Sequence, residues 1–320
     1  MDALIDFGIA LILAIQTLSP ALDGVMEFFT FLGKFEFYLL FIPFIYWIID
    51  ARLGQRLLLI LTVTSIFTAY FKHLFHQPRP FWLGKVIGLQ EETSYGVPSS
   101  HASGSLAVWG GLAYYVNKAW LWVLSIALIL LISFSRLYLG VHFPHDVLFG
   151  WLIGFLVLFI AIRIENPLSA WMNRLSLGKQ ILAGFVASLA MILLGHAVLA
   201  LIANTPDPAE WSQFATQART VTTYYTQSGI FFGAVAGYVL MKRYAPFQTG
   251  GGWAKRILRY LVGLLGVLVL YLGLDQIFIL LAPDESALGY LLRYLRYGSA
   301  AFWVTFLAPW IFLKVRLADS

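Results

Sequence analysis

The sequence predicts an all-α, polytopic membrane helix bundle, and two observations carry that prediction. Hydrophobic residues make up 60% of the 320 positions and charged residues only 12%, and a water-soluble domain cannot cover its surface with so few charges. The apolar residues also gather in runs long enough, or nearly long enough, to cross a bilayer.

Nine or ten of these runs are predicted to cross the membrane. The first is short and ends at Ser19-Pro20, and the amphipathic stretch 22–32 that follows can lie in the interface instead of crossing. The first run also has no basic segment before it, so it lacks the pattern of a cleaved signal peptide. The runs are 3–17, 36–49, 54–74, 100–117, 119–135, 145–163, 181–203, 223–241, 257–282 and 298–313.

A change in composition near residues 164–167 predicts two parts. Residues 1–165 contain all the polar clusters described below. Residues 166–320 are predicted to form an additional C-terminal module of about four transmembrane helices, with extracytoplasmic loops at about 204–222 and 283–297.

The basic residues indicate orientation and not nucleic-acid binding, although the net charge is +5. If the loop that carries Arg52 and Arg56 is cytoplasmic and each later run crosses once, 13 of the 21 Lys and Arg residues are cytoplasmic. This bias places the polar clusters on the extracytoplasmic side. The chain has no cysteine, which excludes disulfides, thiolate metal sites and cysteine catalysis.

The first polar cluster is Lys72 with Arg79-Pro80, at the end of a helix that Pro78 breaks. The guanidinium offers a planar fork for phosphate oxygens, and the ammonium adds a compact point charge. The alternative is a pair of basic side chains that extend from a helix end to the membrane surface.

The second cluster, Pro98-Ser99-Ser100-His101, opens a long apolar run. Ser99 or Ser100 can cap that helix, whose N-terminus is a natural phosphate site. His101 lies in the first turn, where it could give a proton to a leaving oxygen. The alternative is an ordinary serine cap beside an interfacial histidine.

The third cluster is Ser135-Arg136, His142 and Asp146. A carboxylate four residues after a histidine can accept a hydrogen bond from one imidazole nitrogen and leave the other free as a nucleophile. A purely structural His–Asp contact is the alternative. His145 is adjacent, but the spacing to Asp146 favours His142.

Taken together, the three clusters resemble the signature motifs of the type-2 phosphatidic acid phosphatases, the lipid phosphate phosphatase superfamily. The resemblance covers roughly residues 36–163 and implies a six-helix catalytic core that hydrolyses a lipid phosphate or diphosphate without a metal or other cofactor. Ser100 stands where the family usually has glycine, and a side chain there could crowd the phosphate. The stretch from Tyr95 to Ala102 is nevertheless similar to the variant in sphingoid-base phosphate and dolichyl diphosphate phosphatases.

The resemblance also implies a role for each motif residue. His142 would be the nucleophile that forms a phosphohistidine, Asp146 would orient it, and His101 would protonate the leaving group. The phosphate would be bound by Lys72, Arg79, Ser99, Ser100 and Arg136.

Several alternatives stay open at this level. A phosphotransferase would pass phosphate to an acceptor other than water, a soluble sugar phosphate could be the substrate, and a lipid transporter or scaffold could retain the same core. The predicted partners are the bilayer and its lipid phosphate, with no nucleic acid and no assigned oligomeric state. The absence of cysteine and the short loops favour a bacterial inner membrane, with the site facing the periplasm or exterior.

Two features of the C-terminal part invite a second interpretation. His196 and Asp275 could line a groove for the lipid headgroup, but interhelical hydrogen bonding, with Asp275 paired to Arg293 or Arg296, is the simpler explanation. The loop 204–222 could form an interfacial lid, although an ordinary connection is the simpler expectation.

Overall fold

The computed structural model describes residues 2–319, and these residues form helices and loops without a strand, as predicted for an all-α protein. The helices are α1 (Asp2–Gln16), α2 (Asp23–Phe31), α3 (Phe35–Phe44), α4 (Ala51–Phe75), α5 (Ser100–Val116), α6 (Ala119–Tyr138), α7 (Pro144–Asn173), α8 (Leu177–Leu201), α9 (Ser212–Ala215), α10 (Thr222–Tyr244), α11 (Trp253–Leu268), α12 (Leu274–Leu281), α13 (Ala287–Phe302) and α14 (Ala308–Lys314). Short π-helical turns extend α3 and join α11 to α12 and α13 to α14, and a 3₁₀ turn covers Pro80–Leu83.

Five helical segments within residues 2–319 are long and apolar enough to cross a membrane, or six if the bent pair Asp23–Phe31 and Phe35–Ile49 is one span. The sequence predicts nine or ten, because it counts runs such as α5, which is only 17 residues long. The C-terminal part contains the helices α8, α10, α11–α12 and α13–α14, and within the described residues α8 and α11–α12 are the ones long and apolar enough to span, so the module of about four transmembrane helices stays a prediction. Helix α13 begins at Ala287, well before the predicted apolar run at 298. Arg293 and Arg296 lie inside this helix, so its first half is not part of an uninterrupted apolar run.

The residues form two compact units that interleave along the chain. The first unit comprises Met1–Tyr38, Phe67–Ile160 and Gly195–Thr220, and the second comprises Leu39–Ile66, Ala161–Leu194 and Val221–Ser320. The composition boundary near residue 165 falls inside α7, which continues through Pro167. The division into residues 1–165 and 166–320 therefore stays a prediction about domains.

In the first unit, α5 and α6 form a hairpin whose tight connection uses Asn117 in a left-handed conformation (φ 50°). Helix α7 packs on the start of α5 through Gly150 and Gly154. A Cβ added at Gly150 would lie 2.6 Å from the Ser99 carbonyl oxygen. Small residues allow this close backbone approach, and it brings the beginnings of α5 and α7 together.

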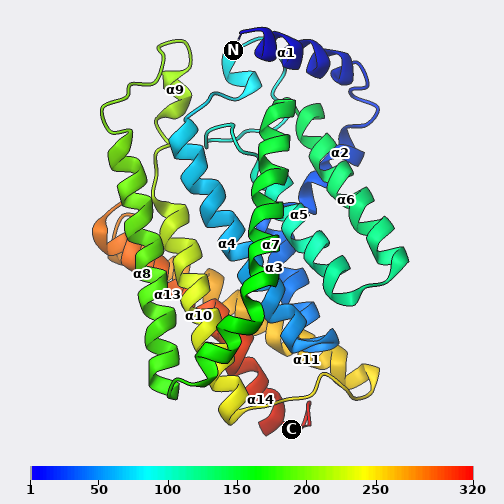
Figure 1. The fold of residues 1–320 in the computed structure, drawn as a ribbon, viewed down its shortest axis with the longest axis vertical. Coiled ribbons are helices and arrows are strands. Elements are labelled where there is room, and N and C mark those ends of the chain that lie inside the picture. The colour runs from blue at the N-terminus through cyan, green and yellow to red at the C-terminus, as the bar shows by residue number, and fades with distance from the viewer. Residues whose placement is uncertain (1, 320) are drawn as a thin grey trace. The chain divides into compact units, whose positions relative to one another are not determined.

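The second unit is held by an aromatic core. Tyr46 and Trp47 are fully buried, and they donate hydrogen bonds to the carbonyls of Thr305 and Val304, both at 2.9 Å. These two carbonyls belong to the π-helical turn Trp303–Leu307, where the ordinary helical pattern is interrupted. Helices α10 and α13 run side by side (Figure 1), with Gly233 against the backbone of Gly298.

Candidate active site

The centre of the predicted site is His142, which lies in the short loop between α6 and α7 and is 1% exposed. Its Nδ1 is 3.1 Å from Asp146 Oδ2, and its Nε2 is 3.1 Å from Arg79 Nη1. A guanidinium can only donate, so Nε2 accepts and the imidazole carries its proton on Nδ1. Burial and the charges of Arg79 and Lys72 lower the pKa of His142 well below its usual value. The ring is therefore neutral at pH 7, with one lone pair directed away from Asp146.

Asp146 is fully buried in the first turn of α7. Its Oδ2 also accepts from the Phe143 backbone N–H at 2.9 Å, and its Oδ1 lies 3.2 Å from His145 Nε2. The Asp146 carbonyl in turn accepts from the Ser99 N–H at 2.9 Å, which joins the second and third polar clusters. These contacts fix the carboxylate, and through it the orientation of the His142 ring.

Arg79, 1% exposed, is held by the backbone on two sides. It donates from Nε to the Ser94 carbonyl at 2.6 Å, and from Nη1 to the Val141 carbonyl at 2.9 Å. Its Nη2 reaches Ser94 Oγ at 3.0 Å and Glu92 Oε2 at 3.4 Å. Because the whole fork is restrained, the guanidinium stays against His142 Nε2.

The other two cations approach from different elements. Arg136, in the last turn of α6, is fully buried and donates to Glu92, to Thr30 and, at 2.8 Å, to Gln90. Lys72, near the end of α4, is 6% exposed and donates to the Tyr95 carbonyl. Backbone carbonyls and neutral side chains supply most of the partners of these cations.

Glu92 is a site residue that the motif analysis missed. Its carboxylate bridges Arg79 and Arg136. Burial by itself opposes ionisation of Glu92, but the two arginines outweigh it and lower the pKa of the carboxyl to about 2. The cluster thus contains the cations Lys72, Arg79 and Arg136 and the carboxylates Glu92 and Asp146. Because Asp146 is hydrogen-bonded to His142, Glu92 is the one carboxylate of this cluster that the arginines share.

The second cluster caps α5 as predicted. Ser99 is the N-cap, is fully buried and accepts from the Ala102 N–H. Ser100 is exposed, so its hydroxymethyl group is not packed among the buried cations. His101 is half-buried, and its buried Nε2 has no hydrogen-bond partner. The ring lies against the α2–α3 turn, because a Cβ added at Gly33 would be 2.5 Å from His101 Cδ2.

The structure thus brings together the predicted residues of all three clusters, with Ser100 at their exposed edge. It adds Glu92, Gln90 and Thr30, which contact the arginines. Gln90 and Glu92 belong to a polar stretch between the first two motifs, and this stretch indicates that the loop could contribute to the site. Thr30 gave no such signal, because it lies in an apolar helix far from every motif.

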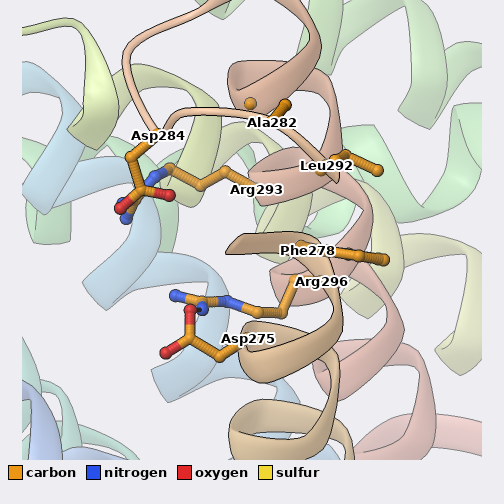
Figure 2. Close-up of a pocket in the computed structure, with 8 residues that line it drawn as sticks. Asp275, Phe278, Ala282, Asp284, Leu292, Arg293 and Arg296 are labelled. Atoms are coloured by element: carbon orange, nitrogen blue, oxygen red, sulfur yellow. Dashed lines mark hydrogen bonds and ion pairs between the residues drawn. The ribbon is translucent and has the colours of Figure 1, made fainter. Parts of the chain in front are cut away.

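Of the two polar residues considered in the C-terminal part, His196 lies at an exposed position of α8 and Asp275 lies in the first turn of α12. Asp275 pairs with Arg296, and Asp284 pairs with Arg293 at 3.1 Å (Figure 2). The simpler interpretation of Asp275, an ion pair with Arg296, is therefore the one that the structure supports. Among residues 2–319, no three His, Asp or Glu side chains are grouped so that they could hold a metal ion.

Two family models match the chain. The PAP2 superfamily matches residues 54–169, and the transmembrane extension of PAP2 superfamily phosphatases matches residues 225–320. Sphingosine-1-phosphate phosphatase 1 of Rattus norvegicus is 28% identical over 91% of this chain and 72% of its own length. Undecaprenyl-diphosphatase of Sulfolobus acidocaldarius is 34% identical over 36% of this chain and 56% of its own. The crystal structure of a PAP2-type phosphatidylglycerolphosphate phosphatase from Bacillus subtilis is 24% identical, with a TM-score of 0.47, over 52% of this chain and 88% of that one.

Proposed function

Because this chain belongs to the PAP2 superfamily, with both the phosphatase domain and its transmembrane extension, we propose that it hydrolyses a lipid phosphate or diphosphate through a phosphohistidine intermediate. It is an integral membrane phosphatase of the lipid phosphate type. The observation that carries the mechanism is the neutral His142 held between Asp146 and Arg79, at 3.1 Å from each, beside the cations Lys72 and Arg136.

In the first step, Nε2 of His142 attacks phosphorus, and the bond from phosphorus to the lipid oxygen breaks. His101, whose Nε2 has no hydrogen-bond partner, acts as an imidazolium beside the bound phosphate dianion, gives one proton to that leaving oxygen and becomes neutral. Asp146 stabilises the positive charge that develops on the imidazole. Arg79 exchanges its contact with Nε2 for a phosphate oxygen as the new bond forms.

In the second step, His101 takes a proton from water, which attacks the phosphohistidine. The nitrogen–phosphorus bond breaks, inorganic phosphate leaves, and both histidines return to their starting states. Phosphoryl transfer depends chiefly on positioning and on charge stabilisation. Lys72, Arg79 and Arg136 supply fixed positive charge for this purpose, so the reaction should need no metal.

The substrate is proposed to be a long-chain phosphate or diphosphate. One relative named above is a phosphatase of sphingosine 1-phosphate and another a diphosphatase of undecaprenyl diphosphate. These two ligands share a phosphate group on a long apolar chain. Hydrolysis is favoured over transfer to another acceptor because both relatives are named for removing phosphate.

The test is phosphate release by the purified protein in detergent, with excess EDTA, across a panel of lipid phosphates and diphosphates. His142→Ala should lower kcat/KM by roughly a thousandfold or more, because it removes the nucleophile. His196→Ala, a change of the same size at an exposed position of α8, is the matched control and should leave turnover unchanged. Phosphate release that continues in His142→Ala, or that EDTA abolishes, would reject the mechanism.

The site is proposed to face the extracytoplasmic side, as the distribution of basic residues predicts. The chain has no cysteine, so single cysteines report orientation without background. In intact cells, an impermeant maleimide should label Lys85→Cys, in an exposed loop beside the site, and should not label Lys118→Cys between α5 and α6. The reverse pattern would place the site in the cytoplasm. A bacterial inner membrane stays a prediction.

A further inference from the structure

A segment outside both family models packs on the loop that holds the phosphate-site cations. We define it as residues 202–219, which follow α8 and precede α10 and include α9. Trp211, Ala215 and Ala218 are buried against Trp82 and Tyr95. The ring of Phe214 stacks on that of Trp82 with centroids 5.8 Å apart. The segment therefore packs apolar side chains on this loop within the first unit.

One polar network joins the 202–219 segment to Tyr95. The Tyr95 hydroxyl lies 3.0 and 3.1 Å from the two oxygens of Asp207 and donates to that carboxylate. Arg219 Nε donates to the same hydroxyl at 2.9 Å and to Asp207 at 3.0 Å. The other nitrogens of Arg219 donate to the carbonyls of Ile202 and Thr205 at 3.1 and 2.7 Å. Arg219 thereby links the two ends of the 202–219 segment and also holds the Tyr95 hydroxyl.

Tyr95 is also part of the phosphate site through its backbone. Its carbonyl accepts from Lys72 Nζ, and the preceding residue, Ser94, accepts twice from Arg79. A second contact reaches the same helix end, because His73 Nε2 lies 2.9 Å from the Ala218 carbonyl oxygen. The chain of contacts from Asp207 through Tyr95 to Lys72 therefore has only one residue between the 202–219 segment and a phosphate-binding cation.

We propose that Asp207 and Arg219 are positioning residues of the phosphatase, which act through Tyr95 to hold Lys72 in its catalytic position. This inference deepens the proposed function and rests on it. Lys72 has a flexible four-carbon stem and is a point charge without the fixed fork of an arginine. The position of Lys72 therefore depends on the Tyr95 carbonyl to which it donates. Asp207 and Arg219 restrain Tyr95 through its hydroxyl group.

Apolar packing alone does not account for this network. Stacking of Trp82 on Phe214 and the burial of Trp211 already fix the segment on the loop. Arg219 already has Asp207 and two carbonyls as partners. The contacts of Tyr95 with both charged side chains add a directional restraint on its backbone, and a small displacement of a catalytic cation costs rate even when the fold is intact.

The first experiment compares Tyr95→Phe, Asp207→Asn and Arg219→Lys with wild type. Asp207→Asn keeps the size of the side chain, Arg219→Lys keeps its charge, and Tyr95→Phe keeps the ring in its apolar contacts. We expect kcat to fall about tenfold in Tyr95→Phe and Asp207→Asn, with KM changed less, because the contact of Lys72 matters most in the transition state. Arg219→Lys, which keeps the charge, should recover part of the rate that Arg219→Gln loses. The matched control is Asp284→Asn, which removes an ion pair of the same kind with Arg293 in the second unit.

The second experiment asks whether these residues act through Lys72. Orthovanadate binding is measured as thermal stabilisation of the protein. In a Lys72→Gln background, adding Tyr95→Phe or Asp207→Asn should cause no further loss of this binding. In the wild-type background each change should weaken that binding about tenfold. Full additivity in both backgrounds would overturn the proposal and leave a structural role. If Asp207→Asn does not fold, Tyr95→Phe decides alone, since it removes only a hydroxyl.

The two proposals fail differently in these assays. If the wild-type protein releases phosphate from no lipid and does not bind vanadate, the proposed function fails. If wild type is active and Tyr95→Phe matches it in kcat and in vanadate binding, only the positioning role of the 202–219 segment fails.

Discussion

Both compact units bury arginine side chains, but they satisfy them in opposite ways. In the second unit, Arg259 is fully buried and donates to three backbone carbonyls, of Gln248, Thr249 and Gly250, at 2.7–2.9 Å. In the first unit, Arg79 and Arg136 lie in one cluster with Lys72 and share the carboxylate of Glu92. The second unit separates its buried charges, whereas the first unit concentrates them.

The partners of a buried cation distinguish the cations proposed to bind phosphate from purely structural ones. Buried charges are costly and normally each acquires its own partners. Both terminal nitrogens of Arg259 donate to backbone carbonyls, which ties the loop 248–250 to α11. The cluster in the first unit has more cations than carboxylates, so it can still accept an anion. A phosphate with two charges fits such a site better than the single carboxylate that now bridges it.

The clearest contrast between the two units is expected from the same Arg→Lys substitution made in each of them. Arg79→Lys removes the fork that holds both the Ser94 backbone and His142 Nε2, so kcat/KM should fall about a hundredfold. Arg259→Lys should lower the melting temperature and leave the turnover of the folded fraction unchanged. Both quantities are measured for both variants, and the same change in the two variants would contradict separate roles for Arg79 and Arg259.

A smaller effect is expected when Glu92 is made neutral. Glu92→Gln removes the anion with which a phosphate must compete, so orthovanadate should bind about tenfold more tightly, while the unliganded protein becomes less stable. Asp284→Asn is the control of the same chemistry at an exposed ion pair and should change neither quantity. Weaker vanadate binding in Glu92→Gln would mean that the carboxylate positions the arginines for phosphate instead of competing with it.

The stability that Glu92 contributes should depend on pH in a defined window. Its folded-state pKa, about 2, lies below the ordinary value of 4.5, so the stabilisation is complete above pH 4.5 and is lost as the pH falls toward 2. The difference in melting temperature between wild type and Glu92→Gln should therefore shrink over this range and be constant above it. A difference that is independent of pH would show that Glu92 is not ionised in the folded protein.

Much of the first unit could be predicted because its motifs obey local rules. Ser99 caps α5, Pro144 begins α7, and the four-residue spacing of His142 and Asp146 produces their contact. Each of these features depends on residues close in sequence, where spacing and backbone preferences decide the geometry.

The partners of the arginines could not be predicted in the same way. Thr30 and Gly33 reach the site only because the α2–α3 turn packs on α5 and α6, and no local pattern reports such a contact. Asp207 and Arg219 lie in a loop without a recognisable motif, and only the folded chain brings them into contact with Tyr95. Helix α13 was predicted to begin too late for a related reason, since Arg293 and Arg296 interrupt its apolar run and find their carboxylates only in the folded chain.

The smallest expected effect tests whether the second unit takes any part in catalysis through its charges. Arg296 is 7% exposed, pairs with Asp275, and lies over the rings of Tyr271 and Tyr297 at 5.3 and 4.8 Å (Figure 2 shows the ion pair). Asp275→Asn should lower the melting temperature modestly, because the rings still face the guanidinium. It should leave kcat/KM for the preferred lipid unchanged. A loss of turnover for long-chain substrates alone would instead assign Asp275 to binding of the lipid headgroup, and the contrast between the catalytic role proposed for the first unit and a structural second unit would no longer hold.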